Sequence, residues 1–262
     1  MDLSLKGKVA LVTGGGRHIG RQIALTLAQE GAKVVVNDYF ADRASAVAAE
    51  IREMGGEAIG LPADVRSQDA VNAMVSQALE KFGKIDVLVN NAGMIPESVG
   101  QMAGPPFADS DKTLWDNTIE VNLYGVLNCT RAVLPGMIKQ HYGKVVSMIS
   151  DAGRSGEARL STYAAAKAGI VGFTKSMAKE VGRHAINFNC VSLGATPQPG
   201  TITEVPDGKL DVFLRQYPLG PGLGRLGQPS DAANAVAFFA SDASAWVTGQ
   251  VLSVSGGFSM VD

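Results

Sequence analysis

Seven short apolar runs alternate with amphipathic stretches of helix length along this chain, and this alternation constrains its fold most strongly. Buried parallel strands are near-continuous apolar runs, and each parallel pair needs a long crossover connection, usually a helix. The pattern therefore predicts an α/β fold in which helices cover both faces of a parallel sheet. The expected strands are Val9 to Val12, Val34 to Val36, Ala58 to Leu61, Val87 to Val89, Val145 to Ile149, Ile186 to Val191 and Val251 to Val254.

The chain shows no internal repeat, low-complexity tract or linker, so we expect one domain over residues 1–262. The formal net charge is −2 and the pI is about 5.9, so neither sign of charge dominates. A protein with this balance is not expected to bind nucleic acid or an anionic membrane. No signal-peptide h-region and no apolar run of membrane-spanning length occurs, which predicts a cytoplasmic protein.

The cysteines and histidines form no metal-ligand pattern. Cys129 and Cys190 lie far apart, and His18, His141 and His184 are scattered. We therefore expect no metal site and, in a cytoplasmic chain, no disulfide.

A glycine-rich turn, Thr13 to Gly20, joins the first expected strand to a helix from Arg21 to Glu30. Glycines at this place let backbone amides approach a pyrophosphate, and the helix dipole favours its charge. A purely steric turn is the alternative. The candidate cofactor-binding residues of the turn are Gly14, Gly16, Arg17, His18 and Ile19.

The second expected strand leads into Asp38. A carboxylate at this place accepts hydrogen bonds from the adenosine ribose hydroxyls and repels a 2′-phosphate, which favours NAD over NADP. Arg17 and Arg43 leave NADP open as the less favoured cofactor, and Asp38 could instead be a solvated turn residue.

Two further turns follow the third and fourth strands. Asp64 is placed to meet the adenine amino group, with Val65 beside it, and Asn91, Ala92 and Gly93 leave room next to a cofactor. Each turn alone could be only a cap. Together they line the carboxyl ends of the strands, where open α/β sheets bind ligands.

Tyr163 and Lys167 lie four positions apart in the expected helix Ser161 to Val181, and this spacing puts both side chains on one face. An ammonium group one turn away favours the phenolate, so Tyr163 is a candidate acid/base. Ser150, at the end of the fifth strand, could donate to the same substrate oxygen. Asn122 sits inside an apolar helical stretch and could loosen the helix and hold a water near Lys167.

These residues, in order and spacing, make the chain resemble the short-chain dehydrogenase/reductase family over essentially its whole length. The resemblance implies a Rossmann-type domain with strand order 3-2-1-4-5-6-7, assembled as a homotetramer or dimer. It implies hydride transfer between a nicotinamide cofactor and a secondary alcohol or ketone. It also implies that Tyr163 is the acid/base, Ser150 orients the substrate oxygen, Lys167 binds the ribose and lowers the Tyr163 pKa, and Asn122 holds a relay water. Gly194 and Thr196 complete the expected cofactor contacts.

Two positions depart from the family pattern. His18 replaces a glycine of the phosphate loop, which narrows the permitted backbone angles there. Leu193 replaces a proline, so the loop beside the nicotinamide is expected to be less rigid.

Two long segments, residues 94–110 and 195–224, are expected to wall the substrate site. Their apolar residues suggest a medium-sized, largely apolar substrate; packing within the protein or between subunits is the alternative. These residues include Met94, Ile95, Met102, Phe107, Val212, Phe213 and Leu214.

A weaker similarity to hydroxyacyl-CoA dehydrogenases, carried by residues 150–152 and 249–257, makes a 3-hydroxyacyl or 3-oxoacyl thioester an alternative substrate. Asp151 and Arg154 could touch a polar substrate group or be solvated turn residues. A non-catalytic nucleotide-binding subunit or regulator is the alternative of another class.

Overall fold

The computed structural model describes residues 3, 5–95, 104–197, 205 and 208–261. Within them, seven parallel strands form one sheet in the order β3-β2-β1-β4-β5-β6-β7, which confirms the predicted topology. The strands are β1 (Val9–Val12), β2 (Lys33–Asp38), β3 (Ala58–Pro62), β4 (Val87–Asn90), β5 (Gly143–Ser150), β6 (Ile186–Leu193) and β7 (Val251–Val254).

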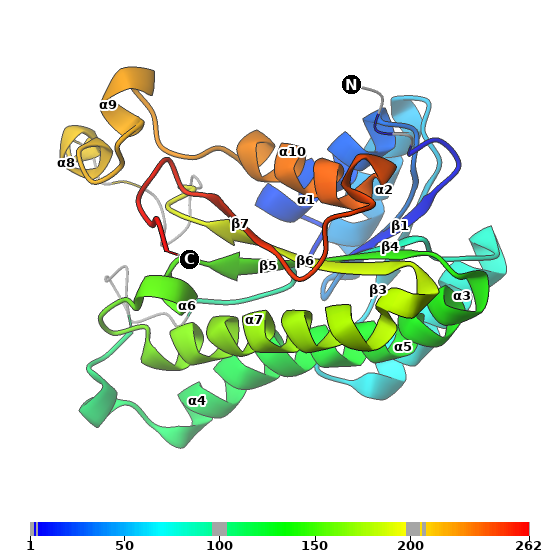
Figure 1. The fold of residues 1–262 in the computed structure, drawn as a ribbon, viewed down its shortest axis with the longest axis horizontal. Helices are drawn as coiled ribbons and strands as arrows, with labels where there is room; N and C mark the ends of the chain where they lie inside the picture. Colours follow the sequence, from blue (N-terminus) through cyan, green and yellow to red (C-terminus); the bar gives the residue numbers. More distant parts are fainter. Residues whose placement is uncertain (1–2, 4, 96–103, 198–204, 206–207, 262) are drawn as a thin grey trace.

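Helices cover both faces of the sheet. Figure 1 shows α1, α2 and α10 on one face and α3, α5 and α7 on the other, with α6, α8 and α9 at the end toward which β5, β6 and β7 point. The α-helices are α1 (His18–Gln29), α2 (Ala41–Glu53), α3 (Gln68–Phe82), α4 (Lys112–Ile119), α5 (Gly125–Gln140), α6 (Ala152–Ser155), α7 (Ser161–Val181), α8 (Leu210–Leu214), α9 (Gly220–Leu223) and α10 (Pro229–Ala240).

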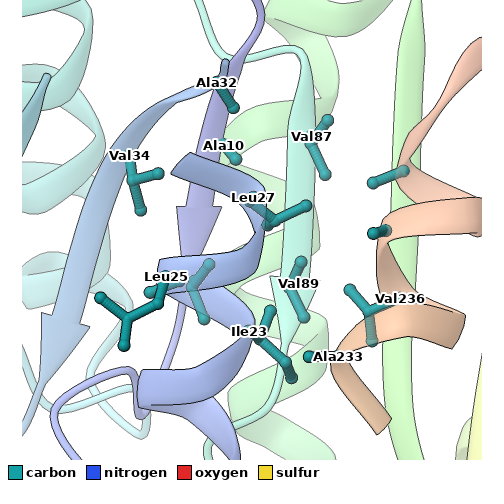
Figure 2. Close-up of a cluster of buried hydrophobic side chains, with 14 of the residues drawn as sticks. Ala10, Ile23, Leu25, Leu27, Ala32, Val34, Val87, Val89, Ala233 and Val236 are labelled. Carbon is teal, nitrogen blue, oxygen red and sulfur yellow. The ribbon is translucent and has the colours of Figure 1, made fainter. Parts of the chain in front are cut away.

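Alternate residues of each strand feed two cores. In β2, Val34 and Val36 pack with α1 and α10, whereas Val35 packs on the opposite face of the sheet. Figure 2 shows Ile23 of α1 close to Ala233 of α10 above the strands. Burial of one such aliphatic side chain stabilises the fold by about 1.5–3 kcal/mol, so the apolar runs fix the sheet.

The strands end later than their apolar runs. β2 continues to Asp38, β5 to Ser150 and β6 to Leu193, because backbone pairing continues through polar residues, as between Ser150 and Leu193. These residues therefore sit at the carboxyl edge of the sheet. Helix α1 begins at His18, three residues before the predicted start, and α7 has the predicted bounds.

The expected helix from Asp111 onward is divided. A π-helical segment, Glu120–Tyr124, lies between α4 and α5. Among the described residues, no helix has the length and apolar character needed to cross a bilayer.

Candidate active site

A cavity of about 710 Å³ opens at the carboxyl ends of the strands and brings together the predicted site residues. Its lining includes Gly14, Arg17, His18, Ile19, Asp38, Asp64, Val65, Asn91, Ala92, Gly93, Asn122, Ser150, Tyr163, Lys167, Gly194 and Thr196. The remaining candidate, Gly16, acts through its backbone, as described below.

The glycine-rich turn is closely packed against the end of β4. A Cβ atom on Gly14 would lie 2.9 Å from the Ala92 Cα, and one on Gly20 would lie 2.1 Å from the Gly14 carbonyl oxygen. The Asn91 side-chain amide donates to the carbonyls of Thr13 and Gly14, each at 3.0 Å. Asn91 therefore holds the turn in place.

The N-terminus of α1 faces this cavity and carries no side-chain cap at Arg17. Its first amides are left for another acceptor, and the helix dipole favours an anion there. These features fit the pyrophosphate of a dinucleotide.

His18 adopts a left-handed backbone with φ of 52°. This conformation is easy for glycine and uncommon for other residues. The predicted narrowing of the permitted backbone angles at His18 is therefore confirmed. Burial, followed by the charges of Arg17 and Arg43, lowers the pKa of His18 below its usual value.

Asp38 is 6% exposed and is held by backbone amides at the end of β2. Its Oδ2 accepts from the Gly16 N–H and its Oδ1 from the Phe40 N–H, both at 3.1 Å. A carboxylate has about four acceptor sites, so two hydrogen bonds leave capacity for ribose hydroxyls. This geometry fits an adenosine diol.

Asp64 has a partner that the motif did not predict. The Arg66 guanidinium pairs with its carboxylate, with Nη2 and Oδ2 2.7 Å apart, and this hydrogen bond lowers the Asp64 pKa. Arg66 also lines the cavity. An adenine amino group would therefore share the Asp64 carboxylate with Arg66.

The four candidate catalytic residues come from β5, the π-helical segment and α7. Ser150 is the last residue of β5, and its hydroxyl forms a hydrogen bond with Tyr163. Lys167 lies one turn further along α7, and its Nζ donates to the Met148 carbonyl at 3.0 Å. Tyr163 and Lys167 are only 8% and 5% exposed.

Burial determines the protonation of this pair. Burial raises the pKa of Tyr163 to about 12, because the Ser150 hydrogen bond only partly opposes it. Burial also lowers the pKa of Lys167 to about 8. The implied lowering of the Tyr163 pKa by Lys167 stays a prediction, since burial and the Ser150 hydrogen bond are the leading causes that act on this phenol.

Asn122 lies in the π-helical segment, so the predicted loosening of the helix is confirmed. Its Nδ2 donates to the Met94 carbonyl at 2.8 Å and the Thr118 carbonyl at 3.0 Å, and its Oδ1 accepts from the Met94 N–H at 3.3 Å. A Cβ atom on Gly93 would lie 2.8 Å from the Asn122 Oδ1 and 3.3 Å from the Lys167 Nζ. Asn122 and Lys167 therefore converge on Gly93.

The expected apolar wall is only partly correct. Met94, Ile95 and Phe213 line the cavity, whereas Phe107 stacks on Trp115 and Leu214 is buried elsewhere. Val212 is exposed, and Met102 lies outside the described residues. The pattern did not single out several other lining residues, among them Arg66, Glu157, Leu160 and Phe258, because they occur in short irregular segments without periodicity.

Leu193 and Asp151 are more tightly held than expected. Leu193 continues β6, its carbonyl accepts from the Asp151 N–H at 3.0 Å, and the next residue, Gly194, donates to Val254. Asp151 is buried and accepts a hydrogen bond from Ser192, so the interpretation of Asp151 as a solvated turn residue is wrong.

Both cysteines are free and buried, and no cluster of metal-ligating side chains occurs in the described part of the chain.

Known proteins are similar to this chain over nearly its full length. A family model described as short chain dehydrogenase matches residues 8–206. The (2S)-[(R)-hydroxy(phenyl)methyl]succinyl-CoA dehydrogenase subunit BbsD of Thauera aromatica is 40% identical over 258 residues, covering 98% of this chain and 99% of the relative. The 3-oxoacyl-[acyl-carrier-protein] reductase FabG of Staphylococcus epidermidis is 39% identical over 254 residues, with 97% and 99% covered. FabG of Thermotoga maritima is 36% identical over 255 residues, with the same coverage.

Proposed function

This chain belongs to the short-chain dehydrogenase family, and we propose that it transfers a hydride between NAD(H) and the alcohol or ketone carbon of an acyl thioester. Family membership makes it an NAD(P)-dependent oxidoreductase acting on CH–OH groups. The observation that carries the proposal is the hydrogen bond between Ser150 and Tyr163 at the cavity, beside Lys167.

A bound NAD(H) would supply the hydride-transfer chemistry, and the side chains of this protein would handle the proton. Tyr163 donates its phenol proton to the carbonyl oxygen during reduction and takes a proton from the hydroxyl during oxidation. The Ser150 hydroxyl donates to the same oxygen and stabilises charge that develops on it. Lys167 binds the ribose of the nicotinamide. Asn122 holds a relay water, which is supported by the convergence of Asn122 and Lys167 on Gly93.

The proposed cofactor is NAD. The acceptor capacity of Asp38 suits an unmodified ribose, and its charge would repel a 2′-phosphate. Arg17 and Arg43 line the same end of the cavity and favour NADP as the second candidate. The other proposed cofactor contacts are the cavity-lining residues of the glycine-rich turn, Asp64, Val65, Asn91, Ala92, Gly93, Gly194 and Thr196.

The proposed substrates are 3-hydroxyacyl and 3-oxoacyl thioesters. Two relatives are named for reactions on an acyl-CoA and on a 3-oxoacyl carrier protein, and this supports the thioester. Ile95, Leu160, Phe213 and Phe258 supply an apolar wall for the acyl part. A simple apolar alcohol or ketone is the second candidate, favoured by the same wall.

We further propose that residues 1–262 form one domain and that the protein assembles as a homotetramer or dimer, as the family resemblance implies. Sedimentation equilibrium measures the assembly.

The function is tested with acetoacetyl-CoA, cyclic ketones, steroids and sugars, each assayed by nicotinamide absorbance with NADH and NADPH. We expect NADH-dependent turnover of the thioester. Tyr163→Phe should lower kcat by about 10²–10⁴-fold, the usual contribution of a general acid, and leave NADH binding nearly intact. Substantial remaining activity in this variant would reject the role of Tyr163. Failure to bind either NADH or NADPH at millimolar concentration would favour a non-catalytic protein.

A further inference from the structure

Arg154 lies on α6, the short helix that follows Ser150, and joins two distant parts of the chain. Its Nη1 donates to the Ser253 hydroxyl of β7, and its Nη2 donates to the carbonyl oxygen of Val261. Arg154 is not among the described residues that line the cavity. Its guanidinium therefore acts on the C-terminal segment, which we define as residues 255–261.

Helix α6 is itself anchored to the sheet. Asp151, at the N-terminus of α6, is 2% exposed, and its Oδ1 accepts from the Ser192 hydroxyl at 2.6 Å. Ser192 and Ser253 are direct neighbours across the β6–β7 pair. Asp151 and Arg154 are thus hydrogen-bonded to two serines that face each other on β6 and β7. These contacts fix the position of α6, and with it the backbone of Arg154.

The C-terminal segment returns over the end of the sheet and reaches the cavity. Gly256 and Gly257 have φ of 58° and 86°, a left-handed pair that turns the chain back after β7. The Gly256 carbonyl accepts from the Leu219 N–H at 3.0 Å. Phe258 then stacks on Tyr217 with ring centres 5.0 Å apart, and both rings line the cavity.

Little apolar burial holds the end of this segment. Met260 is 80% exposed, and Val261 and Phe258 are also exposed. Exposed apolar side chains gain little from packing, so the hydrogen bond from the Arg154 guanidinium to the Val261 carbonyl is a main attachment of the segment beyond Phe258.

We propose that Arg154 is a positioning residue that holds the C-terminal segment in place, so that Phe258 and Tyr217 form a specificity-determining wall for substrates with a ring on the acyl group. A stacked aromatic pair offers a flat face that another ring packs against, whereas a short acyl chain gains little from it. The substrate part of this inference rests on the proposed thioester function. The attachment of the segment does not.

The attachment is tested by hydrogen exchange of the backbone amides of the C-terminal segment, without any substrate. Arg154→Ala should speed their exchange about tenfold, the effect of losing a hydrogen bond to a charged group. Arg154→Lys should recover part of the protection, because an ammonium still reaches one acceptor. Arg52→Ala is the matched control, since Arg52 donates to the Ala58 carbonyl far from the C-terminal segment. Unchanged exchange in Arg154→Ala would overturn the attachment.

Specificity is tested with benzoylacetyl-CoA, which carries a phenyl ring, and acetoacetyl-CoA, which carries none. Arg154→Ala should raise KM for benzoylacetyl-CoA about tenfold, change KM for acetoacetyl-CoA less than about twofold, and leave kcat and its pH profile unchanged. Phe258→Ala should raise KM for benzoylacetyl-CoA by a similar factor, and the double variant should raise it no further. Equal loss with both thioesters, or additive effects, would show that Arg154 has only a general structural role.

The two proposals fail in different ways. If the wild type turns over neither thioester, the proposed function is wrong, and the exchange experiment still decides the attachment. If the wild type turns over both and Arg154→Ala discriminates neither, the specificity wall is wrong and the function stands.

Discussion

The Lys167 Nζ lies 5.6 Å from the centre of the Tyr163 ring, and burial favours the neutral form of both side chains. The pKa of Tyr163 is raised to about 12, so this phenol carries its proton near neutral pH. The pKa of Lys167 is lowered to about 8, so the ammonium is the group that titrates in the working range. The cation beside the phenol is therefore present below about pH 8 and lost above it.

We predict that kcat/KM for NADH in ketone reduction falls as the pH rises above about 8. This parameter reports groups of the free enzyme, and a singly titrating group gives a tenfold loss for about each pH unit. Lys167→Met should lower the rate at pH 7 and remove this limb. A wild-type profile that stays flat to about pH 10 would contradict the assignment to Lys167.

Ser150→Ala should lower kcat by about 10²-fold, the typical cost of losing one oxyanion donor. The Ser150 hydrogen bond lowers the Tyr163 pKa, so its loss should also move the alkaline rise in alcohol oxidation to higher pH. Ser76→Ala is the control, because that hydroxyl bonds only within α3, to the Asn72 carbonyl. Equal kcat values in the two variants would exclude a catalytic hydroxyl at Ser150.

Much of this site could be predicted because it depends on local patterns. The apolar runs fixed the strands, and the spacing of Tyr163 and Lys167 fixed their shared helix face. Since the carboxyl ends of parallel strands meet at one edge, residues that follow different strands had to converge there.

What the sequence did not reveal depends on tertiary contacts. The pairing of Arg66 with Asp64 and the stacking of Phe258 on Tyr217 have no periodic signature. Spacing gives proximity but says nothing about burial, so the sequence did not predict that burial would dominate the pKa values of Tyr163 and Lys167.

Asp38→Ala should reduce the preference for NADH over NADPH by at least about tenfold. The carboxylate accepts from only two backbone amides, so its removal deletes acceptors for ribose hydroxyls and the charge that repels a 2′-phosphate. The measurement is kcat/KM for both cofactors with one ketone. Asp42→Ala, on the first turn of the neighbouring helix α2, is the charge-matched control. An unchanged ratio in Asp38→Ala would show that other groups select the cofactor.

Asn122→Ala should destabilise the fold by about 1–3 kcal/mol, because it leaves the N–H and carbonyl of Met94 without their partner at the edge of the cavity. Activity should fall by more than the loss of folded protein explains, since Gly93 and Lys167 adjoin the same amide. Urea unfolding and kcat measured on the same preparation separate the two effects. A stability loss with normal kcat would confine Asn122 to a structural role.

His18 should make cofactor affinity depend on pH. Its pKa is lowered in the free protein by burial and by Arg17 and Arg43, and a pyrophosphate at the N-terminus of α1 would raise it. The extra affinity from the imidazolium is fully present below the free-state pKa and is lost as pH rises through the cofactor-bound pKa. NADH should therefore bind more tightly as the pH is lowered from the cofactor-bound pKa of His18 toward its free-state pKa. His18→Gly should bind NADH without this pH dependence, and it should remove the strain of a left-handed backbone at a residue with a side chain.

His141→Gly is the matched control, because His141 has φ of 51° at the end of α5, away from the cavity. Fluorescence titrations at several pH values measure the effect, and the same slope in His18→Gly as in the wild type would place the titrating group elsewhere.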